Sequence, residues 1–309
     1  MDSIVGYTGF VGGNICESHR FDGYYNTQNI SEAFGTGPDR LVYCGVRAEK
    51  YVADMLPEED FAHIREAFEN IRRINAKQTI LVSTIDVLSD LRRSDEDSIT
   101  APERLDPYGR NRLLLEDLVR EHCARYLIVR LPALFGKGLK KNFIYDMINP
   151  IPWRLSSVKY AELGGASDVI RGAYVPDVKG FYRRKDAASA QDHRLEKAFR
   201  ELGFSTLSFT DSRASFQFYP LKHLWEDIVK ADGHDISLLH LATEPVNAGE
   251  LYRQLTGKTF LNEFLPASRI KQYDFITKHD ALFGGRDGYI LNASEIIAEI
   301  RAFVGESAS

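Results

Sequence analysis

Three regularly spaced glycines follow the first apolar run of the chain, and they constrain its fold more than any other feature. Residues 3–5 are typical of a short strand, and Gly6, Gly9 and Gly12 come directly after it. Residues 10–18 then begin a helix. A strand that turns sharply into a helix needs glycine wherever a Cβ would block the turn or the packing of the helix. The pattern therefore predicts that the chain opens with a strand–turn–helix unit.

Strands and helices continue to alternate through the first half of the chain. Apolar runs predict further strands near 24–26, 41–44, 79–83 and 126–129. A helix is predicted behind Pro57, where apolar side chains recur at helical spacing as far as Ile74, and another includes Leu113–Val119. Alternating strands and helices indicate a parallel sheet, so we predict an α/β fold with a Rossmann-like, doubly wound sheet.

The regular alternation ends near residue 136, and this predicts two parts. We expect a Rossmann dinucleotide-binding domain over 1–136 and a smaller, mixed substrate-binding lobe over 137–309. A strand near 238–243 and a helix near 293–304 are expected to return to the Rossmann core.

Composition excludes several classes of protein. With 309 residues, 44% hydrophobic and 27% charged, the chain has ordinary globular composition. A net charge of −5 argues against nucleic acid as the main ligand. The three cysteines are scattered and the eight histidines form no HExxH motif, so no metal is expected. No apolar run could span a bilayer, and the first five residues lead straight into the glycine turn, so we expect a cytoplasmic protein without a signal peptide.

The glycine turn is suited to a dinucleotide. The start of a helix offers unpaired N–H groups and the positive end of the helix dipole to a pyrophosphate, and glycine lets the phosphates approach the backbone. The alternative is a purely structural turn. We expect the cofactor to contact Gly6, Thr8, Gly9, Phe10, Val11 and Gly12.

The choice between NAD and NADP depends on Asn26 and Thr27. Asn26 stands where an acidic residue usually binds the ribose 2′-hydroxyl, and asparagine does not repel a 2′-phosphate. No arginine lies near it, and the next is Arg40. We favour NADP, although the same residues also fit a simple polar turn.

Thr84 and Tyr108 are candidate catalytic residues. Thr84 ends the strand at 79–83 and Tyr108 opens a later helix, so both fall where ligands bind in a doubly wound sheet. A hydroxyl and a phenol there can share one substrate oxygen. A tyrosine with its usual pKa near 10 needs a nearby cation, and Arg112 lies one helical turn further on. Taken singly, Thr84 could merely cap the strand and Tyr108 could be a half-buried aromatic.

In these features the sequence resembles the extended short-chain dehydrogenase/reductase superfamily, the NAD-dependent epimerase/dehydratase group. The matching positions are the three glycines, Ser83–Thr84, Tyr108, the stretch from Arg130 to Gly136, and Leu241–Val246 followed by Glu250–Leu251. The resemblance implies NAD(H) or NADP(H) and a small-molecule sugar substrate, mostly nucleotide-linked. It also implies that Tyr108 is the acid/base, that Thr84 polarises the reacting oxygen, and that Arg112 binds the nicotinamide ribose. Members often form dimers, which leaves a homodimer open.

Two departures from the family pattern stand out. The motif lysine is replaced by Arg112, which keeps the charge but has a longer, planar head. The segment between Asn26 and Leu41 is too short for the extra helix and strand of many relatives. In this it is similar to the dTDP-4-dehydrorhamnose reductase branch, which reduces 4-keto sugars.

For the substrate we expect contacts from Lys141, Asn142 and Arg213, given their places in the family fold. A basic run at 179–185 is more typical of a solvated loop. Two functions remain open. One is an NAD(P)-dependent oxidoreductase or epimerase, and the other is a dinucleotide-binding sensor or scaffold subunit without efficient catalysis.

Overall fold

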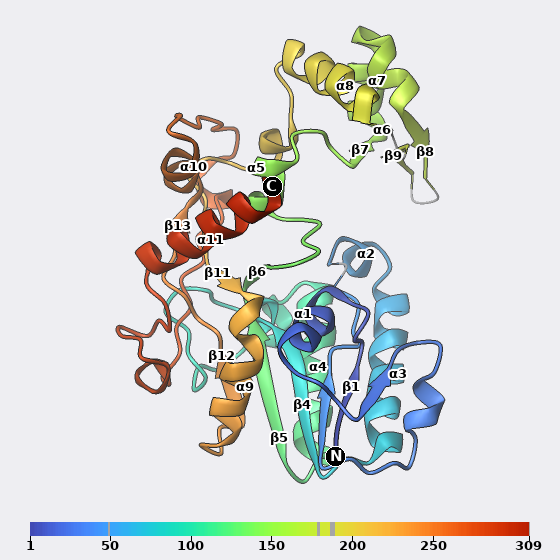
Figure 1. Ribbon diagram of the computed structural model, residues 1–309, viewed down its shortest axis with the longest axis vertical. Coiled ribbons are helices and arrows are strands. Elements are labelled where there is room, and N and C mark those ends of the chain that lie inside the picture. Colours follow the sequence, from blue (N-terminus) through green and yellow to red (C-terminus); the bar gives the residue numbers. More distant parts are fainter. Residues whose placement is uncertain (49, 178–179, 186–188, 309) are drawn as a thin grey trace. The chain divides into compact units, whose positions relative to one another are not determined.

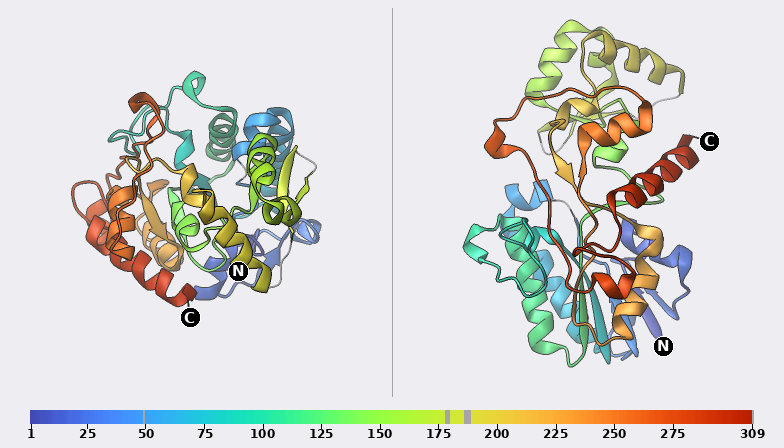
Figure 2. Two further views of the ribbon diagram at one scale, coloured as in Figure 1. Left: turned by 90° about the horizontal axis from the view of Figure 1, so that it is seen from above. Right: turned by 90° about the vertical axis from the view of Figure 1, so that its left-hand side faces the viewer.

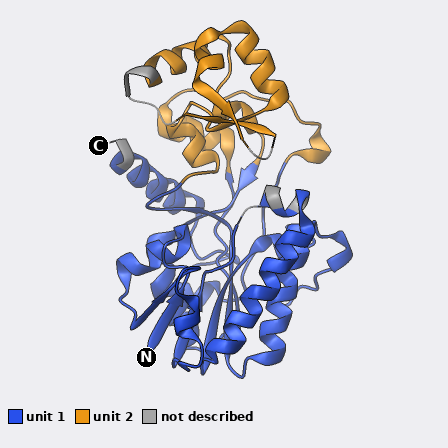
Figure 3. Cartoon of the chain, turned by 90° about the vertical axis from the view of Figure 1, so that its right-hand side faces the viewer, with its two compact units in different colours: residues 1–139, 215–246, 271–309 blue, residues 140–214, 247–270 orange. Residues whose placement is uncertain are grey.

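The chain divides into two compact units, shown in blue and orange in Figure 3. The structure, a computed structural model, describes residues 1–48, 50–177, 180–185 and 189–308. Unit 1 consists of 1–139, 215–246 and 271–309, and unit 2 of 140–214 and 247–270. The segments that return to unit 1 are thus longer than the strand and helix expected to do so.

A six-stranded parallel sheet forms the centre of unit 1 (Figure 1). Its order is β12-β5-β4-β3-β1-β2, and all of its strand pairs are parallel. The strands are β1 (Asp2–Val5), β2 (Gly23–Tyr25), β3 (Arg40–Tyr43), β4 (Gln78–Thr84), β5 (Tyr126–Leu131) and β12 (Leu238–His240). The predicted doubly wound α/β fold is confirmed.

The order of the strands reverses between β1 and β3. From β1 the chain moves to β2 on one side and then to β3 on the other, so the carboxyl ends of β1 and β3 form the switch point at which such folds bind ligands. Between β2 and β3 lies only a short 3-10 turn, η1 (Ile30–Ala33). This confirms the prediction that the segment is too short for an extra helix and strand.

Side chains on successive positions of each strand enter two different cores. In β1, Ile4 packs under α1 (Phe10–Ser18) and α9 (Leu224–Asp232), whereas Val5 faces α3 (Pro57–Ile74) and α4 (Pro107–His122). The same alternation recurs in β3, β4 and β5 because neighbouring side chains of a strand point to opposite faces. Figure 2 (right) shows the sheet between these two layers of helices.

The remaining elements of unit 1 are short pieces and the last helix. They are α2 (Lys50–Met55), η2 (Ile85–Val87), η3 (Pro102–Arg104), β6 (Ala133–Phe135), β10 (Ser215–Phe216), β11 (Phe218–Pro220), η5 (Leu221–His223), η7 (Asp280–Phe283) and α11 (Ala293–Ala308). β11 pairs with β6, and β10 pairs with β13 (Val246–Asn247), in two separate two-stranded sheets. Within the described ranges, no helix combines the length and the apolar character needed to cross a membrane.

Unit 2 is built from short helices around a small antiparallel sheet of order β7-β9-β8. Its helices are α5 (Phe143–Ile148), α6 (Ser157–Ala166), α7 (Asp168–Ala173), α8 (Ser189–Glu201) and α10 (Ala248–Thr256), with turns η4 (Thr206–Phe209) and η6 (Ala267–Arg269). The strands are β7 (Arg154–Ser156), β8 (Tyr174–Pro176) and β9 (Phe181–Arg184). A core that includes Leu163, Ile170 and Phe199 holds α6, α7 and α8 to this sheet.

Candidate active site

The glycine turn lies at the carboxyl end of β1, beside the point where the strand order reverses. Gly6 has a φ of +89°, and a Cβ there would lie 2.7 Å from the backbone carbonyl of Cys44 after β3. A Cβ on Gly12 would lie 2.3 Å from the carbonyl oxygen of Gly6. Both glycines are therefore required by the packing of strand, turn and helix.

Gly9 differs from the other two glycines. A Cβ on Gly9 would meet only the Gly6 oxygen, at 3.2 Å, so the packing of the protein tolerates a side chain there with a small shift. Gly9 is also the N-cap residue of α1 and no side chain caps the helix, which leaves its first N–H groups without a side-chain acceptor. This bare helix start fits a phosphate group.

Asn26 and its neighbours form a polar turn after β2. The Asn26 side-chain oxygen accepts from the N–H of Gln28 at 2.8 Å, and the Asn26 N–H donates to the side chain of Asn29 at 2.8 Å. The turn-forming alternative for Asn26 is thus realised, while ribose contacts by Asn26 and Thr27 stay predictions. Arg40 begins β3 at the opposite end of the sheet and pairs there with Asp2.

Thr84 ends β4 at the carboxyl edge of the sheet. Its hydroxyl donates to the Asp86 carboxylate at 3.1 Å and accepts from the Asp86 N–H at 3.2 Å, which caps η2. In this arrangement the Thr84 proton points to Asp86. To polarise a substrate oxygen, the hydroxyl would have to exchange that partner.

Gly109 allows α4 to come close to η2. A Cβ on Gly109 would lie 2.2 Å from the backbone oxygen of Asp86, so no other residue fits at this contact. The Asp106 side chain caps α4 by accepting from the Gly109 N–H at 2.8 Å. These contacts bring Tyr108, in the first turn of α4, to the same edge as Thr84. Sequence reasoning missed Gly109, although a glycine inside a helix is a signal of close packing.

Arg112 lies under Tyr108 and is bound inside the protein. Its guanidinium carbon lies 4.3 Å from the centroid of the Tyr108 ring, and the residue is 5% exposed. It donates to both carboxylate oxygens of Asp60, at 2.8 and 2.9 Å, and to the backbone oxygen of Arg47 at 2.6 Å. The predicted ribose contact of Arg112 would compete with these three hydrogen bonds, and it stays a prediction.

The surroundings of Tyr108 keep it in the phenol form. Burial raises the pKa of Tyr108, the Arg112 cation opposes that rise, and the Asp86 carboxylate adds to it. The net pKa is raised, so at neutral pH the side chain is a proton donor rather than a phenolate.

Lys50 is a site residue that sequence reasoning missed. From the start of α2, its ammonium group contacts the carboxylates of Asp86 at 2.6 Å and Asp106 at 2.7 Å. It lies 5.9 Å from the centroid of the Tyr108 ring. Asp86, which holds the turn after β4 through Thr84, therefore also binds a cation. No motif spacing could have identified Lys50, because it reaches the site from a different element.

Solved structures match the fold over the whole chain, whereas no protein-family model and no curated protein matches the sequence. A dTDP-4-dehydrorhamnose reductase from Clostridium acetobutylicum has 13% identity and a TM-score of 0.65, covering 100% of this chain and 99% of that chain. The one from Bacillus anthracis has 16% identity and a TM-score of 0.65, with 99% and 97% covered. UDP-glucose 4-epimerase from Thermotoga maritima has 12% identity and a TM-score of 0.62, with 100% and 99% covered.

The chain has their fold. These neighbours are extended short-chain dehydrogenases/reductases, the superfamily that the sequence resembles. At such low identities the likeness concerns the fold alone. In this Rossmann-like fold, the carboxyl edge that holds the glycine turn, Thr84 and Tyr108 is where ligands bind.

The predicted substrate residues all belong to unit 2. Asn142 caps α5 by accepting from the Tyr145 N–H at 3.1 Å, and Lys141 precedes it on the surface. Arg213 binds the Asp211 carboxylate at 2.9 and 2.8 Å and the backbone oxygen of Leu265 at 2.6 Å. Asn142 and Arg213 therefore have structural roles, and substrate contacts by the three residues stay predictions. Of the basic run at 179–185, Lys179 lies outside the described residues.

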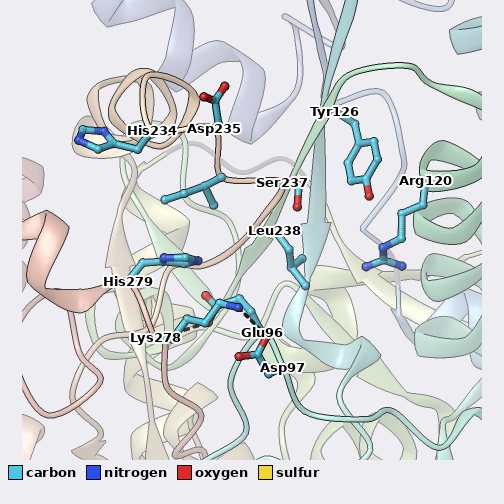
Figure 4. Close-up of a pocket in the computed structure, with 11 residues that line it drawn as sticks. Glu96, Asp97, Arg120, Tyr126, His234, Asp235, Ser237, Leu238, Lys278 and His279 are labelled. Carbon is cyan, nitrogen blue, oxygen red and sulfur yellow. Dashed lines mark hydrogen bonds and ion pairs between the residues drawn. The ribbon is translucent and has the colours of Figure 1, made fainter.

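A cavity of about 410 Å³ lies elsewhere in unit 1 and contains none of the predicted site residues. Figure 4 shows Lys278 beside Glu96 and Asp97, with Tyr126 and Leu238 also lining it. Tyr126 begins β5 and Leu238 begins β12, so this cavity lies away from the carboxyl edge. Across the described part of the chain, no three His, Cys, Asp or Glu side chains are arranged to hold a metal ion.

Proposed function

We propose that this chain is an NAD(P)-dependent oxidoreductase or epimerase that acts on a sugar, with a nucleotide-linked keto-sugar as its substrate. The observation that carries the proposal is the convergence of the bare glycine turn, Thr84 and Tyr108 at one edge of the sheet. They come from three separate segments of the chain, and a doubly wound sheet uses this edge for ligands.

The cofactor part of the proposal is supported by the fit of the glycine turn. The space in front of Gly9 and the uncapped start of α1 suit a pyrophosphate, and a bound nicotinamide would supply the hydride. Among the neighbours, one structure contains NADP, another NADPH and another NAD. We favour NADP for this chain because Asn26 carries no charge that would repel a 2′-phosphate.

The chemistry assigned to this chain is proton transfer and polarisation. The Tyr108 hydroxyl donates its proton to the sugar oxygen as the carbonyl carbon gains a hydride, and the resulting phenolate is then reprotonated from solvent. The Thr84 hydroxyl turns from Asp86 to the same oxygen. The raised pKa of Tyr108 favours this reducing direction. The choice of a nucleotide-linked sugar rests on the neighbours, one of which binds UDP-glucose with NAD.

Two variants test the proposal. Gly9→Val should still fold, because a Cβ there meets a single atom at 3.2 Å, but its side chain should fill the phosphate position and abolish NADP(H) and NAD(H) binding in calorimetry. Tyr108→Phe should keep cofactor affinity and lose about 10²–10⁴-fold in turnover on a panel of nucleotide-linked keto-sugars. Unchanged cofactor affinity in folded Gly9→Val would refute the cofactor site.

A second function is favoured by one observation, the commitment of Arg112 to Asp60. If that pair prevents Arg112 from serving the cofactor and Tyr108, the chain is a dinucleotide-binding sensor or scaffold subunit. Tight binding of NADP(H) or NAD(H) by the wild type, without turnover of any sugar on the panel, would identify this second function.

A further inference from the structure

Lys50 forms ion pairs with two carboxylates, one that binds Thr84 and one that caps the helix of Tyr108. Lys50 contacts Asp86 at 2.6 Å and Asp106 at 2.7 Å, and both carboxylates are themselves engaged. Asp86 accepts from the Thr84 hydroxyl at 3.1 Å. Asp106 accepts from the Gly109 N–H at 2.8 Å and so caps the helix that carries Tyr108. Lys50 thus connects the Thr84 side of the site to the Tyr108 side.

Lys50 and Arg112 are two cations near Tyr108, but they are placed differently. Arg112 is 5% exposed and is held by the bidentate contact to Asp60. The Lys50 side chain is 43% exposed and lies 5.9 Å from the ring centroid of Tyr108. Burial alone lowers the pKa of Lys50, but Asp86 and Asp106 outweigh it and raise the pKa, so the group is charged at neutral pH.

We propose that Lys50 is a positioning residue of this site, whose ammonium group holds Asp86 and Asp106 together and balances their charge beside Tyr108. The inference rests on the proposed function, because it concerns the cation that influences Tyr108 as the proton donor of the proposed reaction. Arg112 at the motif position then binds α4 to α3 and lies against the Tyr108 ring, and Lys50 of α2 is a second cation near that ring.

The sign of the effect follows from the charged and titratable groups around Tyr108. Arg112 of α4, Asp60 of α3 and Asp86 of η2 act on Tyr108 directly. Lys50 of α2 lies near the Tyr108 ring and faces Asp86, Asp106 at the cap of α4, and Tyr273 of the segment 271–309. Removing Lys50 removes a cation and leaves the Asp86 and Asp106 carboxylates without their counter-charge. Both changes disfavour the phenolate, so the pKa of Tyr108 must rise.

The experiment replaces Tyr108 by 3,5-difluorotyrosine in the full chain and follows its titration by ¹⁹F NMR. The fluorinated phenol is more acidic than tyrosine and reports on this position alone. Lys50→Met should raise the midpoint by about one pH unit. An opposite charge within about 4–6 Å shifts a pKa by about 1–3 units, and the lower value applies because the Lys50 side chain is 43% exposed and solvent screens it. Lys50→Arg should restore it, and Asp86→Asn should move it in the opposite direction. Lys77→Met removes an equal charge, paired with Asp39 at the amino end of β4, and should leave it unchanged.

An unshifted midpoint in folded Lys50→Met would overturn the proposal, and so would an equal shift in Lys77→Met. If Lys50→Met does not fold, Asp86→Asn is compared with the double variant Lys50→Met/Asp86→Asn. The fluorinated residue at position 108 should titrate at higher pH in the double variant than in Asp86→Asn. Turnover is read separately. A wild type without turnover, combined with the expected ¹⁹F shifts, would refute the proposed function and retain the role of Lys50.

Discussion

The buried pair between Arg112 and Asp60 yields a prediction about stability as well as chemistry. Their side chains are 6% and 10% exposed, and the contact is bidentate at 2.8 and 2.9 Å. Arg112→Met would leave the Asp60 carboxylate buried without its partner, and breaking a buried ion pair in this way costs about 3–5 kcal/mol. Asn111 still donates to Asp60 at 2.9 Å, so we expect the lower end, about 3 kcal/mol.

Urea unfolding followed by intrinsic fluorescence is the assay, because the slope of the free energy against urea concentration shows whether a chain with two units unfolds in one step. Arg120→Met on the same helix is the matched control. Arg120 is 29% exposed, and its buried partner Glu116 keeps its contacts to Arg130 and Ser83, so the loss of Arg120 should cost about 1 kcal/mol or less. The double variant Asp60→Leu/Arg112→Met should recover at least half of the loss, because apolar side chains often replace a buried ion pair at little cost.

The same variant also tests the chemistry. Arg112 lowers the pKa of Tyr108 against the effect of burial, so Arg112→Met should move the Tyr108-dependent limb of the pH–rate profile upward. Arg112→Lys keeps the charge and should retain turnover, although it cannot reproduce the bidentate contact. A loss of less than about 1 kcal/mol in Arg112→Met would refute the buried pair, and an unshifted profile in an active Arg112→Met enzyme would refute its effect on Tyr108.

Three further predictions concern packing, pH and unit 2. Gly12→Ala should cost about 1–3 kcal/mol in urea unfolding, because its Cβ would lie 2.3 Å from the Gly6 oxygen, whereas Gly9→Ala should cost clearly less. Reduction of a keto-sugar should show no loss through ionisation of Tyr108 below about pH 10, since the pKa is raised; a falling limb near pH 8 that Tyr108→Phe abolishes would contradict this. Burial raises the pKa of Asp146 from 3.8 to about 7. Between these pH values the folded chain keeps the Asp146 proton and the unfolded chain has lost it, so the free energy of unfolding falls as the pH rises. Asp146→Asn should therefore be about 1–2 kcal/mol more stable than wild type at pH 8 and not at pH 4, as measured by urea unfolding.

Local features of the sequence determined the framework of unit 1. The glycine spacing predicted the first strand–turn–helix, and apolar runs predicted the strands of the sheet to within one or two residues at most ends. Such features are readable because steric limits on a turn and the periodicity of a helix or strand act within a few residues. The alternation of strands and helices also predicted that Thr84 and Tyr108 share one edge, because the start of the helix that follows a strand lies on the side of the sheet where that strand ends.

The tertiary structure decided which charges surround those residues. Arg112 lies one turn from Tyr108 by sequence, but its partner Asp60 belongs to another helix, and Lys50 arrives from a third. The division into units was also beyond sequence reasoning in detail, because 215–246 and 271–309 return to unit 1. Ion pairs and returning segments depend on which elements pack against each other in the folded chain. Residues far apart in the sequence form such contacts without any regular spacing that could predict them.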